Sequence, residues 1–274
     1  TEDWLSFFMF TFFQDRDGKF QLTSLAESGF DPLSRSCRFM LTEEAHHMFV
    51  GESGVGRVVE RSAQLSAEHD TLEIGRHGGI PLAMIQKWIN FHFSICLDLF
   101  GQEKSTNAAN FYSMGLKGRY NENKIEDDHL LNNDGFLVPD LQNGKVIMSE
   151  ISALTAINER LRNDYRDDCQ KGVDRWNRII EKANVDFKLT LPHIAFNRNI
   201  GTFQDSNFDL EGNLISAEEF AANKDTWMPN SKDREFVKSL MQRVVEPGKM
   251  AGWIAPPSRG IQGKDIEYEY VILH

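Results

Sequence analysis

Residues 41–51 have the sequence LTEEAHHMFVG, which places two glutamates and two histidines inside an otherwise apolar run. Residues three or four apart share one face of a helix, so Glu44 and His47 point the same way, as do Glu43 and His46. Burying such groups is costly unless they are paired or bind a metal. The stretch therefore predicts a packed helix that carries part of a metal site. The simpler alternative is a solvated helix face with a chance Glu-x-x-His.

A turn before this stretch brings a third candidate ligand to the pair. The sequence GFDP at residues 29–32 is a turn signal between two helices. In a hairpin centred on this turn, residue 44 lies level with residue 15, an aspartate at the end of an aromatic helix. A carboxylate from one helix and Glu-x-x-His from its neighbour form half of a ferritin-like di-iron site. We therefore expect Asp15, Glu44 and His47 to be metal ligands.

A complete di-iron site needs a second half. The candidate within the chain is Glu126-x-x-His129, with Asp98 as the additional carboxylate. The surrounding residues 118–135 lack an apolar face, so we interpret them as a solvated acidic loop. Asp98 is interpreted as a buried polar group satisfied by its neighbours. These residues therefore disfavour a complete di-iron site within the chain.

Apolar periodicity and turn residues divide the chain into helices and a small amount of β structure. Asp31 is predicted to cap the second helix and Pro32 to occupy its first turn. A hairpin is expected at 136–149, turning at Asn143-Gly144, and a short strand at the C-terminal end. The expected helices are 3–15, 20–28, 33–66 with a weak point at 51–56, 81–116, 150–184, 216–223 and 231–245.

These elements predict a mainly α protein. We expect a partial ferritin-like helical bundle over residues 1–185, carrying the half-site. Residues 186–274 are expected to form an irregular C-terminal region with short helices and a little β structure, packed on the bundle.

Composition limits the classes of partner. The chain has 274 residues, of which 41% are hydrophobic and 26% charged, and a formal net charge of −11. This negative charge argues against nucleic-acid binding and against attachment to an acidic membrane surface. Three separated cysteines indicate a reduced, cytoplasmic setting. The apolar run near the N-terminus is shorter than the roughly 20 residues of a membrane-spanning helix.

Several longer segments resemble benzoyl-CoA 2,3-epoxidases, the di-iron epoxidase components of aerobic benzoate degradation. The resemblance extends over nearly the whole chain, although it covers only part of the family protein. In that family, an upstream segment supplies a glutamate and a further Glu-x-x-His, and the second half-site falls on Asp15, Glu44 and His47. The segments that carry the resemblance are DWLSFFMFTFFQDRDGKFQLTSLAESGFDPLSRSCRFMLTEEAHHMFVGESG, STNAANFYSMGLKGR, ALTAINERLRNDY, GVDRWNRII, DFKLTLPH, FVKSLMQRVVEPGKMAGWIAPPSRGI and YEYV.

The resemblance implies the chemistry. An oxidoreductase of this family uses O2 and a di-iron (Fe) centre to insert one oxygen atom across the C2–C3 bond of benzoyl-CoA. The electrons come from a separate NADPH-dependent reductase that carries flavin and iron–sulfur centres. Glu43 and His46 are interpreted as bystanders or as groups that orient the ligands. No residue that binds the acyl-CoA is assigned.

Three other functions remain open at this point. The first is a related di-iron oxygenase that acts on another aromatic or acyl-CoA substrate. The second is a non-catalytic helical subunit that lacks a complete metal site. The third, iron storage, is disfavoured by the irregular C-terminal region.

A weaker motif lies at residues 207–218, NFDLEGNLISAE, which partly matches an EF-hand calcium loop. Its first position lacks the expected aspartate. A glycine turn followed by a helix capped by Ser216, with Glu219 three residues later, explains the same residues.

Overall fold

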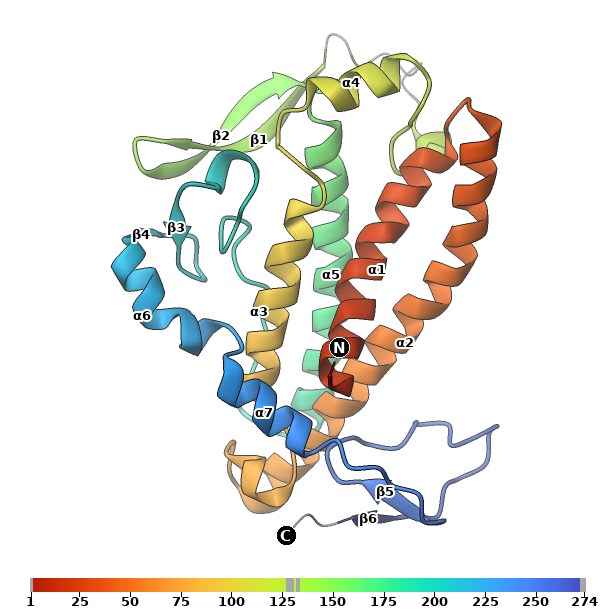
Figure 1. Ribbon diagram of the computed structural model, residues 1–274, viewed down its shortest axis with the longest axis vertical. Coiled ribbons are helices and arrows are strands. Elements are labelled where there is room, and N and C mark those ends of the chain that lie inside the picture. The colour runs from red at the N-terminus through yellow and green to blue at the C-terminus, as the bar shows by residue number, and fades with distance from the viewer. Residues whose placement is uncertain (1, 127–130, 132–133, 272–274) are drawn as a thin grey trace.

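Four long helices, α1 (Trp4–Ala26), α2 (Asp31–His69), α3 (Leu82–Asp98) and α5 (Ile157–Lys182), run alongside one another and form the body of the structure (Figure 1). The coordinates are a computed structural model that describes residues 2–126, 131 and 134–271. The mainly α class with short strands, predicted from the sequence, is confirmed.

α1 is continuous, so the interruption predicted at residues 15–19 is wrong. Asp3 caps the helix and accepts a hydrogen bond from the Ser6 amide. The charged residues within the supposed interruption are compensated by other helices, because both Arg16 and Lys19 form ion pairs with Asp168 of α5. A charged stretch with a glycine therefore stays helical, because tertiary partners satisfy its side chains.

α2 is also continuous, and the weak point predicted at residues 51–56 is wrong. Its glycines are buried where α2 crosses α1. A Cβ on Gly51 would lie 2.4 Å from the Phe12 nitrogen, and one on Gly54 would lie 2.4 Å from the Phe8 ring. These glycines permit a close helix crossing. The helix begins at Asp31, two residues before the predicted start at 33. The prediction that Asp31 caps it is wrong, because Phe30 is the N-cap residue, whereas Pro32 lies in the first turn as predicted.

The environment of α2 changes along its length. Residues 31–50 bury Cys37 alone, whereas most of residues 51–66 are buried. The first half exposes large apolar side chains, with Phe39 80% and Phe49 68% exposed. The second half is held by the remainder of the protein, and the first half projects from it beside α1 (Figure 1).

The single helix predicted for residues 81–116 is instead two helices, α3 and α4 (Thr106–Ser113). Gly101 adopts a left-handed conformation with φ of +81°. Arg162 of α5 donates hydrogen bonds to the carbonyls of Leu97 and Gly101, and Ser105 caps α4. The apolar periodicity did not reveal this break because its cause lies on another helix.

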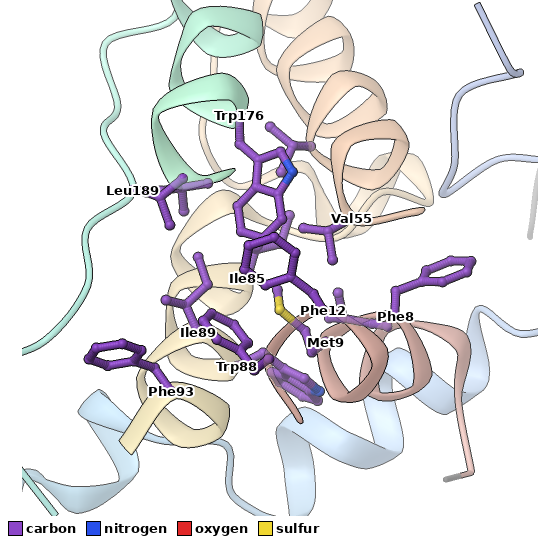
Figure 2. Packing of buried hydrophobic residues seen from close by; sticks show 14 of the residues in the cluster. Phe8, Met9, Phe12, Val55, Ile85, Trp88, Ile89, Phe93, Trp176 and Leu189 are labelled. Atoms are coloured by element: carbon purple, nitrogen blue, oxygen red, sulfur yellow. The ribbon is translucent and has the colours of Figure 1, made fainter. Parts of the chain in front are cut away.

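The hydrophobic core lies between the four long helices (Figure 2). The Phe12 ring lies 4.5 Å from the Trp176 ring, measured between centroids. Gly172 of α5 leaves room for Phe12, because a Cβ there would be 2.4 Å from the ring. Further core residues shown in Figure 2 are Phe8, Met9, Val55, Ile85, Trp88, Ile89, Phe93 and Leu189.

The predicted hairpin is confirmed as β1 (Gly135–Gln142) and β2 (Lys145–Ser152), which pair antiparallel. Asn143 and Gly144 have φ of 50° and 74°, the positive values that favour a tight hairpin turn. Because β2 continues to Ser152, α5 begins at Ile157 and the earlier start predicted at residue 150 is wrong.

The C-terminal segment carries short elements and packs on the helices. Asp233 forms an ion pair with Lys87 of α3, and the Ala255 amide donates to the Arg57 carbonyl of α2. No helix in the described ranges is long and apolar enough to cross a bilayer. The elements of this segment are η3 (Gly201–Phe203), β3 (Asn207–Phe208), β4 (Leu214–Ile215), α6 (Ala217–Trp227), α7 (Ser231–Ser239), β5 (Lys249–Ala251) and β6 (Glu269–Val271). Two short 3-10 helices, η1 (Ile74–His77) and η2 (Glu122–Lys124), lie earlier in the chain.

Candidate metal centre

The α1–α2 hairpin brings Asp15, Glu44 and His47 together. One potential ligand atom from each of the three residues lies within 4.8 Å of the other two. The His47 Nδ1 atom is 3.6 Å from Asp15 Oδ2 and 3.8 Å from Glu44 Oε2. The geometry predicted from the spacing about the turn is therefore present. Glu43 and His46 are exposed on α2 beside this cluster.

The two carboxyl groups of the cluster have perturbed proton affinities. Partial burial raises the pKa of Asp15, and the nearby His47 opposes this increase. Burial also raises the pKa of Glu44, and the negative charge of Asp15 raises it further. The Glu44 Oε2 atom is buried and has no hydrogen-bond partner among the described residues. Both carboxylates would thus be stabilised by a cation between them.

The donor set fits iron. Carboxylate oxygens and an imidazole nitrogen are the ligands of non-haem iron sites in proteins. Asp15 and Glu44 supply the oxygens and His47 supplies the nitrogen. The orphaned Glu44 oxygen is an observation independent of the sequence motif, and a bound metal ion would satisfy it.

Arg16, the residue after Asp15, fixes the position of α1 at this level. Its guanidinium is buried and lies 3.0 Å from both Glu52 of α2 and Asp168 of α5. It also donates to the Phe12 carbonyl and stacks on the Phe12 ring. One cation thus ties three helices together beside the cluster, and this restricts the orientation of Asp15.

The alternative second half-site is not assembled by the described residues. Asp98 instead accepts hydrogen bonds from the Arg198 guanidinium and the Asn199 amide. Glu126 is exposed, and His129 lies outside the described residues. Within residues 2–126, 131 and 134–271, the Asp15 cluster is the one group of three or more potential metal ligands.

The partial EF-hand motif forms a different structure. Asp209 accepts hydrogen bonds from the Glu211 amide and from the backbone and side chain of Asn213. The carboxylate therefore closes its own loop. Ser216 caps α6 and accepts from the Glu219 amide, which confirms the capped-helix alternative.

Two residues next to the cluster were missed by the sequence analysis. Asp17 is buried, and burial is the main cause that raises its pKa to about 7, with the charge of Glu44 adding to the increase. Gly18 lies against the Glu44 carboxylate. Their stretch, DRDG, resembles an ordinary exposed turn, so the sequence carried no signal for either role.

The fold and the cluster define a mainly helical protein with a carboxylate–imidazole cluster on a helical hairpin. No family model matches the chain. The chain is 53% identical over 274 residues, 99% of its length, to benzoyl-CoA oxygenase component B of Aromatoleum evansii. This confirms the resemblance predicted from the sequence. The chain spans 58% of the length of that relative.

Proposed function

We propose that the chain is part of the oxygenase component of a benzoyl-CoA 2,3-epoxidase. The observation that carries the proposal is the convergence of Asp15, Glu44 and His47 on one point of the α1–α2 hairpin. The 53% identity to a protein named benzoyl-CoA oxygenase component B supports the substrate class. The proposed assembly is a ferritin-like bundle, to which the α1–α2 hairpin contributes two helices.

The proposed reaction consumes benzoyl-CoA, O2, NADPH and a proton, and yields the 2,3-epoxide, water and NADP⁺. A di-iron centre would supply the reducing power and oxidising strength for splitting O2, chemistry that amino-acid side chains do not provide. NADPH supplies two electrons through a separate flavin and iron–sulfur reductase. One oxygen atom enters the substrate and the other leaves as water, so atoms and electrons balance.

In this proposal the chain holds the metal and sets its geometry. Asp15 and Glu44 provide oxygen ligands and His47 provides a nitrogen ligand. Three side chains do not complete the coordination of two iron ions. The remaining ligands, a glutamate and a second Glu-x-x-His by family resemblance, would come from outside these 274 residues.

The exposed first half of α2 is consistent with a site that needs further protein. Met40 lies one turn before Glu44 and is 49% exposed, and Phe39 is 80% exposed. His47 itself keeps 47% of its side chain accessible. Additional helices over this face would exclude water from the reaction, which an oxygenase requires to protect its oxidant.

Iron binding after anaerobic Fe(II) loading tests the site. The longer protein that carries the remaining ligands is compared with its Glu44→Ala/His47→Ala variant and with a matched control, Glu43→Ala/His46→Ala, which has the same spacing one residue earlier. We expect loss of iron in the first variant and retention in the control. Equal iron contents in all three proteins would refute the assigned ligands.

The reaction is tested in the longer protein that carries the remaining ligands. Supplied with the reductase, NADPH and isotopically labelled O2, it should convert benzoyl-CoA into a product that contains one labelled oxygen atom, detected by mass spectrometry. Turnover of a different acyl-CoA with no reaction of benzoyl-CoA would support the related-oxygenase alternative. Stoichiometric iron without any oxygenated product would refute the enzymatic proposal.

A further inference from the structure

Gly18 lies opposite the proposed ligand Glu44. It follows Asp15 by one turn of α1, and a Cβ at this position would lie 3.4 Å from Glu44 Oε1 and 3.5 Å from Cδ. The three nearest atoms outside the α1 backbone all belong to the Glu44 carboxylate, the third being Oε2 at 3.7 Å. The empty side of Gly18 therefore faces the end of the Glu44 side chain.

The usual reasons for a glycine do not apply here. Gly18 is in the interior of α1, where glycine is less favourable than alanine and no left-handed conformation is needed. Gly51 and Gly54 differ, because a Cβ on either would collide with α1 at 2.4 Å. Helix packing requires glycine at those positions, whereas at position 18 the neighbour is a flexible carboxylate.

The Glu44 carboxylate has little else to fix it. Its Oε2 atom is buried without a hydrogen-bond partner in the described part of the chain, and His47 Nδ1 is 3.8 Å away. The neighbouring donor is His47, which is itself a proposed metal ligand and whose hydrogen bond and charge act on this carboxylate. The carboxylate must be positioned by its tether to α2 and by the surface against which it lies.

We propose that Gly18 is a positioning residue for Glu44. The missing side chain leaves a seat beside α1 in which the carboxylate can turn both oxygens toward the metal. The inference rests on the proposed metal site, and it assigns to α1 a second contribution besides the ligand Asp15. Alanine would narrow the seat, and valine would fill it.

Cobalt(II) titration of the 274-residue chain tests the proposal, because cobalt absorbance reports ligand geometry without turnover. We expect Gly18→Val to weaken Co(II) binding by about tenfold, the low end for groups that orient ligands. Gly18→Ala should change it little, because its Cβ would meet Glu44 at an ordinary contact distance of 3.4 Å. The control is Gly56→Ala on α2, whose Cβ would also make ordinary contacts, 3.6 Å from Trp176. Unchanged affinity and spectrum in Gly18→Val would overturn the proposal.

Urea unfolding of the same metal-free proteins separates this role from a structural one. Gly18→Ala should unfold at an equal or higher urea concentration than the wild type, because alanine favours the helix. This variant would show that α1 tolerates a side chain at position 18, so that weaker Co(II) binding in Gly18→Val is due to the space filled beside Glu44. A lower unfolding midpoint in Gly18→Ala would show that helix packing requires the glycine and would contradict the proposal.

A double-mutant cycle distinguishes failure of this inference from failure of the metal site. If the wild-type chain does not bind Co(II), metal binding requires the ligands from outside these 274 residues, but the contact between Gly18 and Glu44 can still be measured. Gly18→Val should lower the unfolding midpoint less in a Glu44→Ala background than in the wild type, because the carboxylate is already gone. Equal shifts of the unfolding midpoint in the two backgrounds would show that the side chain at position 18 does not contact Glu44, and would overturn the proposal.

Discussion

Gly51 of α2 packs directly on the backbone of Phe12 in α1. A Cβ on Gly51 would lie 2.4 Å from the Phe12 nitrogen and 2.7 Å from the carbonyl carbon of Thr11. This crossing lies one turn beyond His47 on α2 and one turn before Asp15 on α1. The closest approach of the two helices therefore sets the level at which the candidate ligands meet.

We predict that Gly51→Ala destabilises the protein by about 1–3 kcal/mol, the usual cost of overpacking, because the colliding atoms belong to rigid backbone. Urea denaturation measures the change, and Gly56→Ala on the same helix is the control. The control should be neutral or slightly stabilising, since its Cβ meets Trp176 at an ordinary 3.6 Å. Equal behaviour of the two variants would show that the close crossing is not formed.

Removing charge from the cluster should stabilise the metal-free protein. The pKa values of Asp15 and Glu44 are raised on folding, from ordinary values of 3.8 and 4.5. The unfolded state therefore releases its protons first, and stability falls as pH rises through this window. Asp15→Asn and Glu44→Gln should raise the melting temperature at pH 7, and the gain should disappear below pH 4.

The matched change for this prediction is Glu43→Gln, which alters an exposed carboxylate next to the cluster. It should leave the melting temperature nearly unchanged at both pH values. Melting curves of Asp15→Asn and Glu44→Gln that lie below the wild type at pH 7 would contradict the raised pKa values. Both variants should also lose iron. The same substitutions would therefore stabilise the metal-free protein and weaken metal binding.

His92 should make the protein sensitive to acid. Burial, with a smaller contribution from the positive charge of Arg234, lowers its pKa from 6.5 to about 4. The unfolded state binds a proton below pH 6.5 and the folded state does not, so stability is lost as pH falls from 6.5 to 4. The loss due to this residue is at most about 3 kcal/mol.

Denaturation curves at several pH values measure this effect. In His92→Gln the slope of stability against pH between 6.5 and 4 should become shallower, because the residue no longer titrates. His69→Gln, which changes an exposed histidine, should keep the wild-type slope. An unchanged slope in His92→Gln would assign the acid sensitivity to other groups.

Arg198 should be a major contributor to stability. Its fully buried guanidinium contacts Asp98 and Glu103 and donates to the Ile194 and Ile200 carbonyls. Arg198→Met leaves Asp98 without its cation, whereas Glu103 keeps its pair with Arg162. We expect a cost of about 3–5 kcal/mol in urea unfolding. Arg166→Met, which breaks an exposed pair with Asp167, should cost less than about 1 kcal/mol. Similar costs for the two variants would refute this ranking.

The hairpin and its half-site could be predicted because the required information is local. The turn at residues 29–32 and the Glu-x-x-His spacing fix which residues of two consecutive helices are level with each other. Helix periodicity then selects Asp15 as the residue that faces Glu44 and His47, and the structure brings these three together.

The remaining features depend on partners distant in sequence. Arg16 keeps α1 helical through Asp168, 152 positions later, and this contact converts a predicted interruption into a continuous helix. The break between α3 and α4 depends on Arg162 of α5. Gly18 and Asp17 become informative only when Glu44 is placed beside them. None of these contacts can be inferred from the helix propensity of a local segment.

The two halves of α2 differ in how firmly the rest of the protein holds them. Its second half is embedded in the core, and its first half, which carries Glu44 and His47, is mostly exposed. His47 lies four residues from Gly51, roughly 6 Å along the helix axis. A tilt of the first half of α2 by about 10° about Gly51 would therefore move His47 by about 1 Å. Metal–ligand distances tolerate only about 0.2 Å. We therefore expect that protein packed against the outer face of this half of α2 would tune the affinity of the proposed site for iron without touching the metal.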